Sequence, residues 1–382
     1  MLKSFRVNNF KAVQDSQTIN LTPLTAFIGY NGSGKSSLIE ALESYHKIVS
    51  SGLDSAMIPW RGFENIRNCA VSHQQKKLGV ERPCETNPIK FNLAWQDYQT
   101  TMTVTTGSSG DELFIEKESL TIRRKVVAKR TAKGEVYFFG EDYRGKLLDG
   151  QSLINYFLTN QFEIDIFNKI ARWQFVNLNP YVMGSPLPQI RTFNTINLAK
   201  DGLNIAEYLL SIYKLDKAAF DGIIETLQYI LPYVRDLQPT LTLELERNVY
   251  LQLTERDFKV PGWLLSTGTL RILALLALLR HPEPAPLIVI EEIENGLDPR
   301  TIHIIVDEIR NVVEAGKTQV ILTTHSPYLL DLLSLSQIIL VERDDTGQPV
   351  FSRPADQESL QEWSKKFGPG KLYTMNRLSQ HG

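Results

Sequence analysis

Hydrophobic and polar residues alternate over residues 5–10 and 19–21, which predicts two β-strands at the start of the chain. An apolar run over residues 24–28 follows and ends at Gly29. After a glycine-rich loop, the apolar residues between 36 and 49 recur at helical spacing. Strand, glycine loop and helix is the order that a phosphate-binding unit requires.

The rest of the chain falls into three patterns. Short alternating runs separated by turns, from about residue 89 to 136, predict an antiparallel sheet. Residues 150–233 are mainly helical in period, and a strand pair is expected near 241–253. The last third predicts alternating helices and strands at 269–279, 287–290, 302–315, 319–322, 328–333 and 338–341. No internal repeat or sustained heptad is present.

Length and composition narrow the class of protein. A chain of 382 residues is long enough for two or three domains, or for one core with a large insertion. The net charge of −2 argues against a surface built throughout to coat nucleic acid. Two cysteines, Cys69 and Cys84, exclude a disulfide framework and a four-ligand zinc cluster. With no apolar run of membrane-spanning length and no apolar signal core, we expect a soluble, cytoplasmic protein that does not bind a membrane.

The glycine loop matches the phosphate-binding motif G-x-x-x-x-G-K-[ST] in full. Its glycines let main-chain N–H groups surround a phosphate, and the helix N-terminus adds a positive end. We expect Lys35 to neutralise the β- and γ-phosphates of ATP and the Ser36 hydroxyl to ligate Mg²⁺. A chance Gly/Ser-rich turn is disfavoured, because the Lys-Ser pair lies between a strand and a helix. The predicted ATP-binding residues of this loop are Gly29, Asn31, Gly32, Ser33, Gly34, Lys35, Ser36 and Ser37.

Two carboxylates, Glu291 and Glu292, follow the predicted strand at 287–290. Ligands of open α/β sheets bind at the carboxyl ends of the strands. We expect Glu291 to hold the metal, directly or through water, and Glu292 to polarise the attacking water. The alternative, a solvated helix start, is weakened by the P-loop earlier in the chain.

Three further features narrow the class of ATPase. Ser266 and Gly268 precede an apolar helix and offer an anion site at its start, although an ordinary helix N-cap explains them equally well. Asp298 lies six residues past Glu292. His325 follows a predicted strand, where it would sense the γ-phosphate; a lone histidine there would usually be structural.

In their order along the chain, these motifs resemble the ABC-type ATPase group that contains SMC, Rad50 and RecF, and the opening residues 5–11 are similar to the first strand and turn of that group. The likeness is closer to the OLD-like group, whose members are often labelled AAA15 or AAA21. The likeness to the OLD-like group includes residues 173–180 and 201–204 in the middle of the chain. No TOPRIM nuclease motif is recognised after Val341, and the central insertion is too aperiodic for an SMC coiled coil.

The resemblance implies an α/β fold, an ABC-type P-loop core in which a mixed sheet with flanking helices is joined to an antiparallel β subdomain. We expect an N-terminal lobe over residues 1–149, a mainly helical insertion over 150–240 and a C-terminal lobe over 241–382. The resemblance also implies a homodimer or higher oligomer in which Ser266 and Gly268 of one subunit contact ATP bound by the other. It places Asp298 and His325 at that shared interface.

The sequence departs from the ABC pattern in places. Glu291 replaces the usual aspartate, Ile293 replaces a proline, and Asp298 stands where near relatives often have histidine. Gln74 and Gln75 are the candidates for the Q-loop glutamine.

Two basic segments offer phosphate contacts outside these motifs. The stretch from Arg123 to Lys133 would suit a nucleic-acid backbone, but a solvated hairpin or a docking face for an acidic protein explains it as well. Arg61 is a second candidate for a phosphate contact.

The first functional hypothesis is an ATP-hydrolysing switch that dimerises on ATP and controls a separate effector protein, in phage defence or DNA surveillance. The second is a DNA-binding repair ATPase of the RecF/SMC type, so DNA stays open as a partner. A transporter subunit is disfavoured by the opening motif and the large insertion.

Overall fold

In the computed structural model the chain forms two compact units. The first comprises residues 1–173, 335–366 and 375–382, and the second comprises 174–334 and 367–374. The boundaries predicted at 149/150 and 240/241 do not coincide with this division. The structure describes residues 1–68, 87–107, 112–139, 144–159, 165–190, 196–242 and 247–378.

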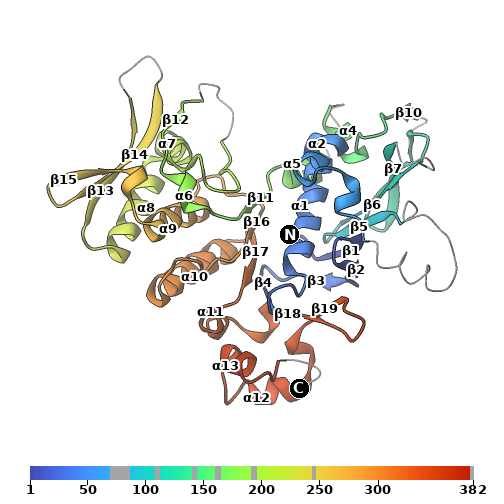
Figure 1. Ribbon diagram of the computed structural model, residues 1–382. Helices are drawn as coiled ribbons and strands as arrows, with labels where there is room; N and C mark the ends of the chain where they lie inside the picture. The colour runs from blue at the N-terminus through green and yellow to red at the C-terminus, as the bar shows by residue number, and fades with distance from the viewer. Residues whose placement is uncertain are drawn as a thin grey trace. The chain divides into compact units, whose positions relative to one another are not determined.

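An antiparallel sheet forms much of the first unit, in the strand order β10-β9-β8-β7-β6-β5-β1-β2, with β3 paired to β1 (Figure 1). Alternation places one side of each strand in the core, as with Ile89, Phe91 and Leu93 of β5. The strands are β1 (Ser4–Phe10), β2 (Val13–Asp15), β3 (Ile19–Asn20), β5 (Ile89–Ala94), β6 (Tyr98–Thr106), β7 (Leu113–Ile122), β8 (Lys125–Arg130), β9 (Glu135–Phe138) and β10 (Arg144–Lys146). Strand β8 was not predicted, because its charged residues hide the alternation.

The P-loop also belongs to the first unit. Strand β4 (Leu24–Ile28) is buried at every residue and pairs in parallel with β18 (Ile338–Arg343). Strand β19 (Pro349–Ser352) runs antiparallel to β18 and completes a hairpin. Helix α1 (Lys35–Ser51) follows the loop, as its apolar spacing predicts. It packs against β1 and against three helices, α2 (Leu53–Met57), α4 (Leu153–Thr159) and α5 (Asp165–Ala171).

The second unit contains three parallel strands, β11 (Gln174–Val176), β16 (Leu287–Ile290) and β17 (Gln319–Thr324). Helix α10 (Pro299–Glu314) contacts β17 with an apolar face and packs against α9 (Thr267–Leu279). Helix α9 is buried at every residue from Ile272 to Leu279, which fits its unbroken apolar sequence. The bounds predicted for the strand at 287–290 are confirmed.

A second sheet lies in the same unit, in the order β12-β14-β13 with β15 paired to β14. The described residues between 150 and 240 form five helices, as the helical period predicts, but also strands, and they are divided between the two units. No helix in the described ranges combines the length and apolar character needed to span a bilayer. The remaining elements named in this unit are β12 (Leu187–Pro188), β13 (Val234–Leu241), β14 (Asn248–Glu255), β15 (Phe258–Pro261), α6 (Pro180–Met183), α7 (Ile205–Leu215), α8 (Lys217–Ile230), α11 (Pro327–Asp331) and α13 (Pro369–Thr374).

Candidate functional site

Glycines permit the tight path of the loop between β4 and α1. Gly32 and Gly34 have φ angles of +78° and +116°, which residues with a Cβ rarely adopt. A Cβ on Gly29 would lie 2.2 Å from the carbonyl oxygen of Val341 on β18. The loop can therefore approach β18 this closely only because residue 29 is glycine.

The Lys35 side chain folds back over the loop that precedes it. Its Nζ donates to the carbonyl oxygens of Gly29, at 2.7 Å, and of Tyr30, at 3.1 Å. No side chain caps the N-terminus of α1, and its first turn carries no acidic residue. A helix start of this kind, with a lysine charge above it, fits a bound phosphate.

Glu291 leaves the end of β16 with a nearly buried carboxylate. Its main-chain N–H donates to the Val176 carbonyl oxygen at 2.9 Å, and its side chain is 10% exposed. Lys200 Nζ lies 3.7 Å from Glu291 Oε1. Sequence reasoning missed Lys200, because a lone lysine in a loop carries no motif. The carboxylate is suited to a cation, and in this structure a lysine approaches it.

Glu292 has an unusual backbone conformation. Its φ angle is +47°, in the left-handed region that side chains other than glycine and asparagine seldom occupy. The main-chain N–H of Glu292 donates to Thr323 Oγ1 at 2.9 Å, and its Oε2 accepts from Asn295 Nδ2 at 2.5 Å. One main-chain and one side-chain hydrogen bond thus hold this exposed residue in a strained backbone conformation, a feature that clusters at functional sites.

A third carboxylate in the same segment had no predicted role. Glu294 Oε1 accepts a hydrogen bond from the main-chain N–H of His325 at 2.5 Å. The segment after β16 is thereby fastened to the residue that follows β17. His325, the predicted γ-phosphate sensor, is half-buried there.

The start of α9 and the segment before α10 meet within the second unit. Ser266 Oγ caps α9 by accepting from the main-chain N–H of Thr269 at 3.1 Å, so the N-cap interpretation of this serine is confirmed. A Cβ on Gly268 would lie 3.1 Å from the carbonyl oxygen of Gly296, closer than most Cβ contacts, so a side chain there would require the Gly296 backbone to shift slightly. Contact of Ser266 and Gly268 with ATP stays a prediction.

Arg271, about one helical turn after Gly268, connects α9 to the segment that contains Gly296. Its Nη2 donates to the Leu178 carbonyl oxygen at 2.9 Å, and its stem lies beside Gly296. Burial lowers the pKa of Arg271, and the charge of Glu292 opposes that shift. The positive charge of Arg271 therefore acts on the carboxylate predicted to polarise water.

Asp298 caps α10. Its Oδ1 accepts from the main-chain N–H groups of Arg300 and Thr301, and its Oδ2 accepts from the Thr301 hydroxyl at 2.5 Å. The Thr301 hydroxyl is the main cause of a lowered pKa at Asp298, with the two main-chain donors adding to it. The structure thus gives Asp298 a helix-capping role, and its contact with ATP stays a prediction.

The predicted site residues fall in both units. The P-loop residues belong to the first unit; Ser266, Gly268, Glu291, Glu292, Asp298 and His325 belong to the second. Gln74 and Gln75 lie outside the described residues. Arg61 is exposed, with a φ angle of +57°, and its role as a phosphate contact stays a prediction.

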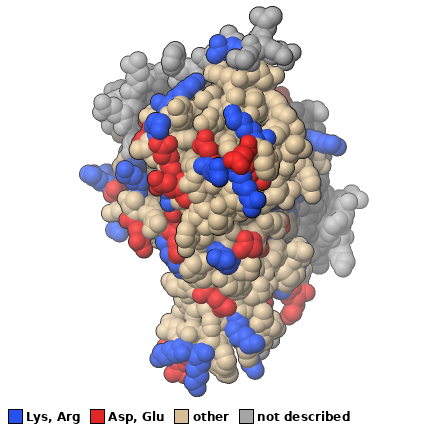
Figure 2. All heavy atoms as spheres, turned by 90° about the vertical axis from the view of Figure 1, so that its left-hand side faces the viewer, with Lys and Arg blue, Asp and Glu red and all other residues tan. Residues whose placement is uncertain are grey.

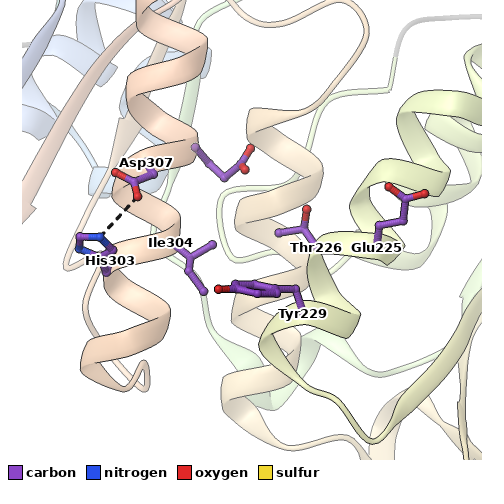
Figure 3. A pocket seen from close by; sticks show the side chains of 7 residues that line it. Glu225, Thr226, Tyr229, His303, Ile304 and Asp307 are labelled. Carbon is purple, nitrogen blue, oxygen red and sulfur yellow. Dashed lines mark ion pairs between the residues drawn. The ribbon is translucent and has the colours of Figure 1, made fainter.

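A cavity of about 520 Å³ between α8 and α10 lies apart from these motifs within the second unit (Figure 3). Its acidic walls are partly neutralised, since Asp307 pairs with Arg310 at 2.6 Å and Glu308 pairs with Arg280 at 2.7 Å. None of the predicted nucleotide-site residues lines it. The residues that do are Glu225, Thr226, Tyr229, His303, Ile304, Asp307 and Glu308.

Comparison with known protein families shows to which family the chain belongs. Residues 104–331, more than half of the chain, match the family described as "AAA domain, putative AbiEii toxin, Type IV TA system". The chain belongs to this AAA family. Residues 1–78 match a second family, described as "AAA ATPase domain". The resemblance to the OLD-like AAA15/AAA21 group and the ABC-type P-loop ATPase fold are thereby confirmed.

Individual relatives of this AAA chain are distant. The OLD nuclease of Thermus scotoductus is 22% identical over 395 residues, which cover 99% of this chain and 69% of that protein. An SMC head solved with the C-winged helix domain of ScpA is 15% identical, covering 94% of this chain and 99% of that one, with a TM-score of 0.49. The SMC head domain from Thermotoga maritima is 15% identical, covering 92% and 98%, with a TM-score of 0.41.

Proposed function

We propose that this AAA chain binds ATP with Mg²⁺ and hydrolyses it in the cytoplasm. Lys35 and the start of α1 would bind the phosphates, and Ser36 and Glu291 would hold Mg²⁺, which neutralises phosphate charge when bound. The observation that carries hydrolysis is the conformation of Glu292, at φ +47°, with its carboxylate held by Asn295. A carboxylate fixed in this way is suited to orient water and accept its proton.

ATP binding would join two copies of the chain. Ser266 and Gly268 stand at the start of α9. Asp298 stands at the start of α10, the next helix along the chain. We infer that the start of α9 closes on the γ-phosphate bound by the Lys35 loop of a second copy, with His325 sensing that phosphate. Closure and hydrolysis then give the two states that a switch needs.

The switch would act on a separate effector protein, in phage defence or DNA surveillance. The names of the relatives support this, since one is an OLD nuclease and the matched family is described as a toxin of a toxin–antitoxin system.

The alternative, a DNA-binding repair ATPase, rests on the basic segment of β7 and β8. Arg123, Arg124 and Lys125 are exposed at the turn between these strands. Arg130, part of the basic stretch considered for a nucleic-acid contact, is not available to DNA, because it is fully buried and donates to the carbonyl oxygens of Leu148 and Asp149. Figure 2 shows the left-hand side of Figure 1, not the side on which β7 is labelled; on its described part basic and acidic side chains are intermixed, so this face offers no single basic surface to DNA either. We therefore favour the effector switch.

Hydrolysis by the purified chain, measured with and without Mg²⁺ and duplex DNA, tests the proposal. Glu292→Gln should lower kcat by roughly 10² to 10⁴, the range for loss of a general base, while ATP still binds. Lys35→Ala should instead abolish tight ATP binding. Parental hydrolysis by Glu292→Gln would remove Glu292 from its role, and a strong stimulation by DNA would favour the repair ATPase.

A further inference from the structure

The β18–β19 hairpin contacts the P-loop at three points within the first unit. Arg343 Nε donates to the Gly32 carbonyl oxygen at 2.8 Å. The main-chain N–H of Arg343 donates to Tyr30 Oη at 3.2 Å. A Cβ on Gly34 would lie 2.7 Å from the ring of Pro349, so the hairpin also touches the end of the loop. Residues more than 300 positions apart thus form one local structure.

Hydrogen bonds to two different segments fix the Arg343 guanidinium. Besides the bond to Gly32, its Nη1 donates to the Gly347 carbonyl oxygen in the turn of the hairpin. The turn is itself ordered by Asp344, whose Oδ1 accepts from the main-chain N–H groups of Thr346 and Gln348, each at 2.9 Å. A planar fork held in this way loses little freedom when it bonds to the loop.

The contact fixes the orientation of one peptide group in the P-loop. Arg343 holds the carbonyl between Gly32 and Ser33, and the N–H of the same peptide donates to the Tyr30 carbonyl oxygen at 3.1 Å. Gly32 itself supplies no restraint, since a Cβ there would meet nothing within 4 Å. Without Arg343, only the hydrogen bond to Tyr30 would restrain this glycine peptide, and ordering it further on nucleotide binding would cost conformational entropy.

The charge of Arg343 is not cancelled locally. Among the described residues, no carboxylate lies within ion-pair distance of its guanidinium. An exposed cation beside a loop that binds phosphate adds a favourable, salt-dependent attraction.

We propose that Arg343 is a positioning residue of the nucleotide site, which holds the Gly32–Ser33 peptide of the P-loop in place for phosphate binding. This rests on the proposed function only in that the loop binds a nucleotide. Since the contact is with the loop and not with the γ-phosphate, Arg343 serves ATP and ADP equally.

Equilibrium binding of ATP and of ADP, together with hydrogen–deuterium exchange of the nucleotide-free protein, tests this role. Arg343→Ala should weaken both affinities by about tenfold, which is ~1.4 kcal/mol. It should also increase exchange at residues 30–34, with little change in Tm because the side chain is exposed. Arg343→Lys keeps the charge but not the planar fork, and should recover only part of the affinity.

Arg353, the residue directly after β19, offers a matched control. It also donates to a main-chain carbonyl oxygen, that of Asn20, but it does not contact the P-loop. Arg353→Ala should leave nucleotide affinity and exchange at residues 30–34 unchanged. Unchanged exchange in Arg343→Ala, or full recovery by Arg343→Lys, would overturn the positioning role. Failure of the parent to bind nucleotide would count against the proposed function instead, because the exchange measurement needs no nucleotide.

Discussion

The main-chain N–H of His325 donates to Oε1 of Glu294, with an N···O distance of 2.5 Å. This bond joins the acidic segment after β16 to the end of β17. Movement of the segment that carries Glu291 and Glu292 is therefore coupled to the histidine predicted to sense the γ-phosphate. The hydrogen bond to His325 gives Glu294 a defined role in the candidate site, although Glu294 is not one of the two predicted catalytic carboxylates, Glu291 and Glu292.

Removal of this bond should affect hydrolysis more than binding. Glu294→Ala leaves the His325 N–H without its acceptor, so His325 and Glu292 lose their fixed relationship. We expect kcat to fall by about tenfold, the effect of losing a positioning contact of ~1.4 kcal/mol, with the Kd for ATP within twofold of the parent. Steady-state hydrolysis and equilibrium binding measure the two effects.

Glu294→Gln provides the matched variant, because its amide oxygen can still accept from His325. It should retain most of the activity. If Glu294→Ala hydrolysed ATP at the parental rate, the bond to His325 would have no part in the reaction.

The sequence predicted those elements whose hydrophobic pattern or motif lies within one short stretch of the chain. The four apolar residues of β16 and the helical spacing after Lys35 gave a strand and a helix in the right places. The glycines of the motif were expected to let main-chain N–H groups surround a phosphate, and Gly32 and Gly34 have the positive φ angles that such a tight loop uses. Each of these features is encoded within about ten adjacent residues, so a single sequence is sufficient to find it.

Contacts between distant segments were not predicted. Arg343 and Gly32 meet because β18 pairs with β4, and no local pattern specifies which strands pair. The burial of Arg130 follows likewise from its position on a strand of the antiparallel sheet, where its neighbours are set by register. In both cases a charged side chain that looks solvated in the sequence bonds to main-chain carbonyl groups.

The capping role of Asp298 predicts a pH-dependent contribution to stability. Because the Thr301 hydroxyl and two main-chain N–H groups stabilise the ionised carboxylate, the folded pKa lies below the ordinary value. The stabilisation is present above the unfolded pKa of about 3.8 to 3.9 and is lost as pH falls through the lower folded pKa. Asp298→Ala should lower the free energy of unfolding by about 1 kcal/mol at neutral pH, as for other N-cap losses.

Urea denaturation at several pH values measures this contribution. The difference between the parent and Asp298→Ala should shrink below pH ~4. Asp298→Asn keeps a capping oxygen without the charge, so it should be destabilised less than Asp298→Ala at neutral pH. A difference that stayed constant down to pH ~2 would contradict the role of the ionised carboxylate.

The shared-site proposal predicts complementation between two inactive variants. Ser266→Arg places a bulky cation at the start of α9 and should block closure and hydrolysis, while ATP binding to the Lys35 loop survives. Since Ser266 also caps α9, Ser266→Ala serves as the control for loss of the cap, which costs about 1 kcal/mol. Lys35→Ala has the opposite defect, an intact α9 start and a loop that no longer binds ATP.

A mixed dimer of Ser266→Arg and Lys35→Ala contains one site with both halves intact and one site with both halves altered. If ATP is held by the loop of one subunit and the α9 start of the other, mixing should restore part of the hydrolysis that each variant lacks alone. Hydrolysis of the mixture is measured against the separate variants, with heterodimers verified by two affinity tags. Tagged heterodimers that hydrolyse no ATP, while the parent does, would mean that Ser266 and Lys35 do not act on one nucleotide across the interface.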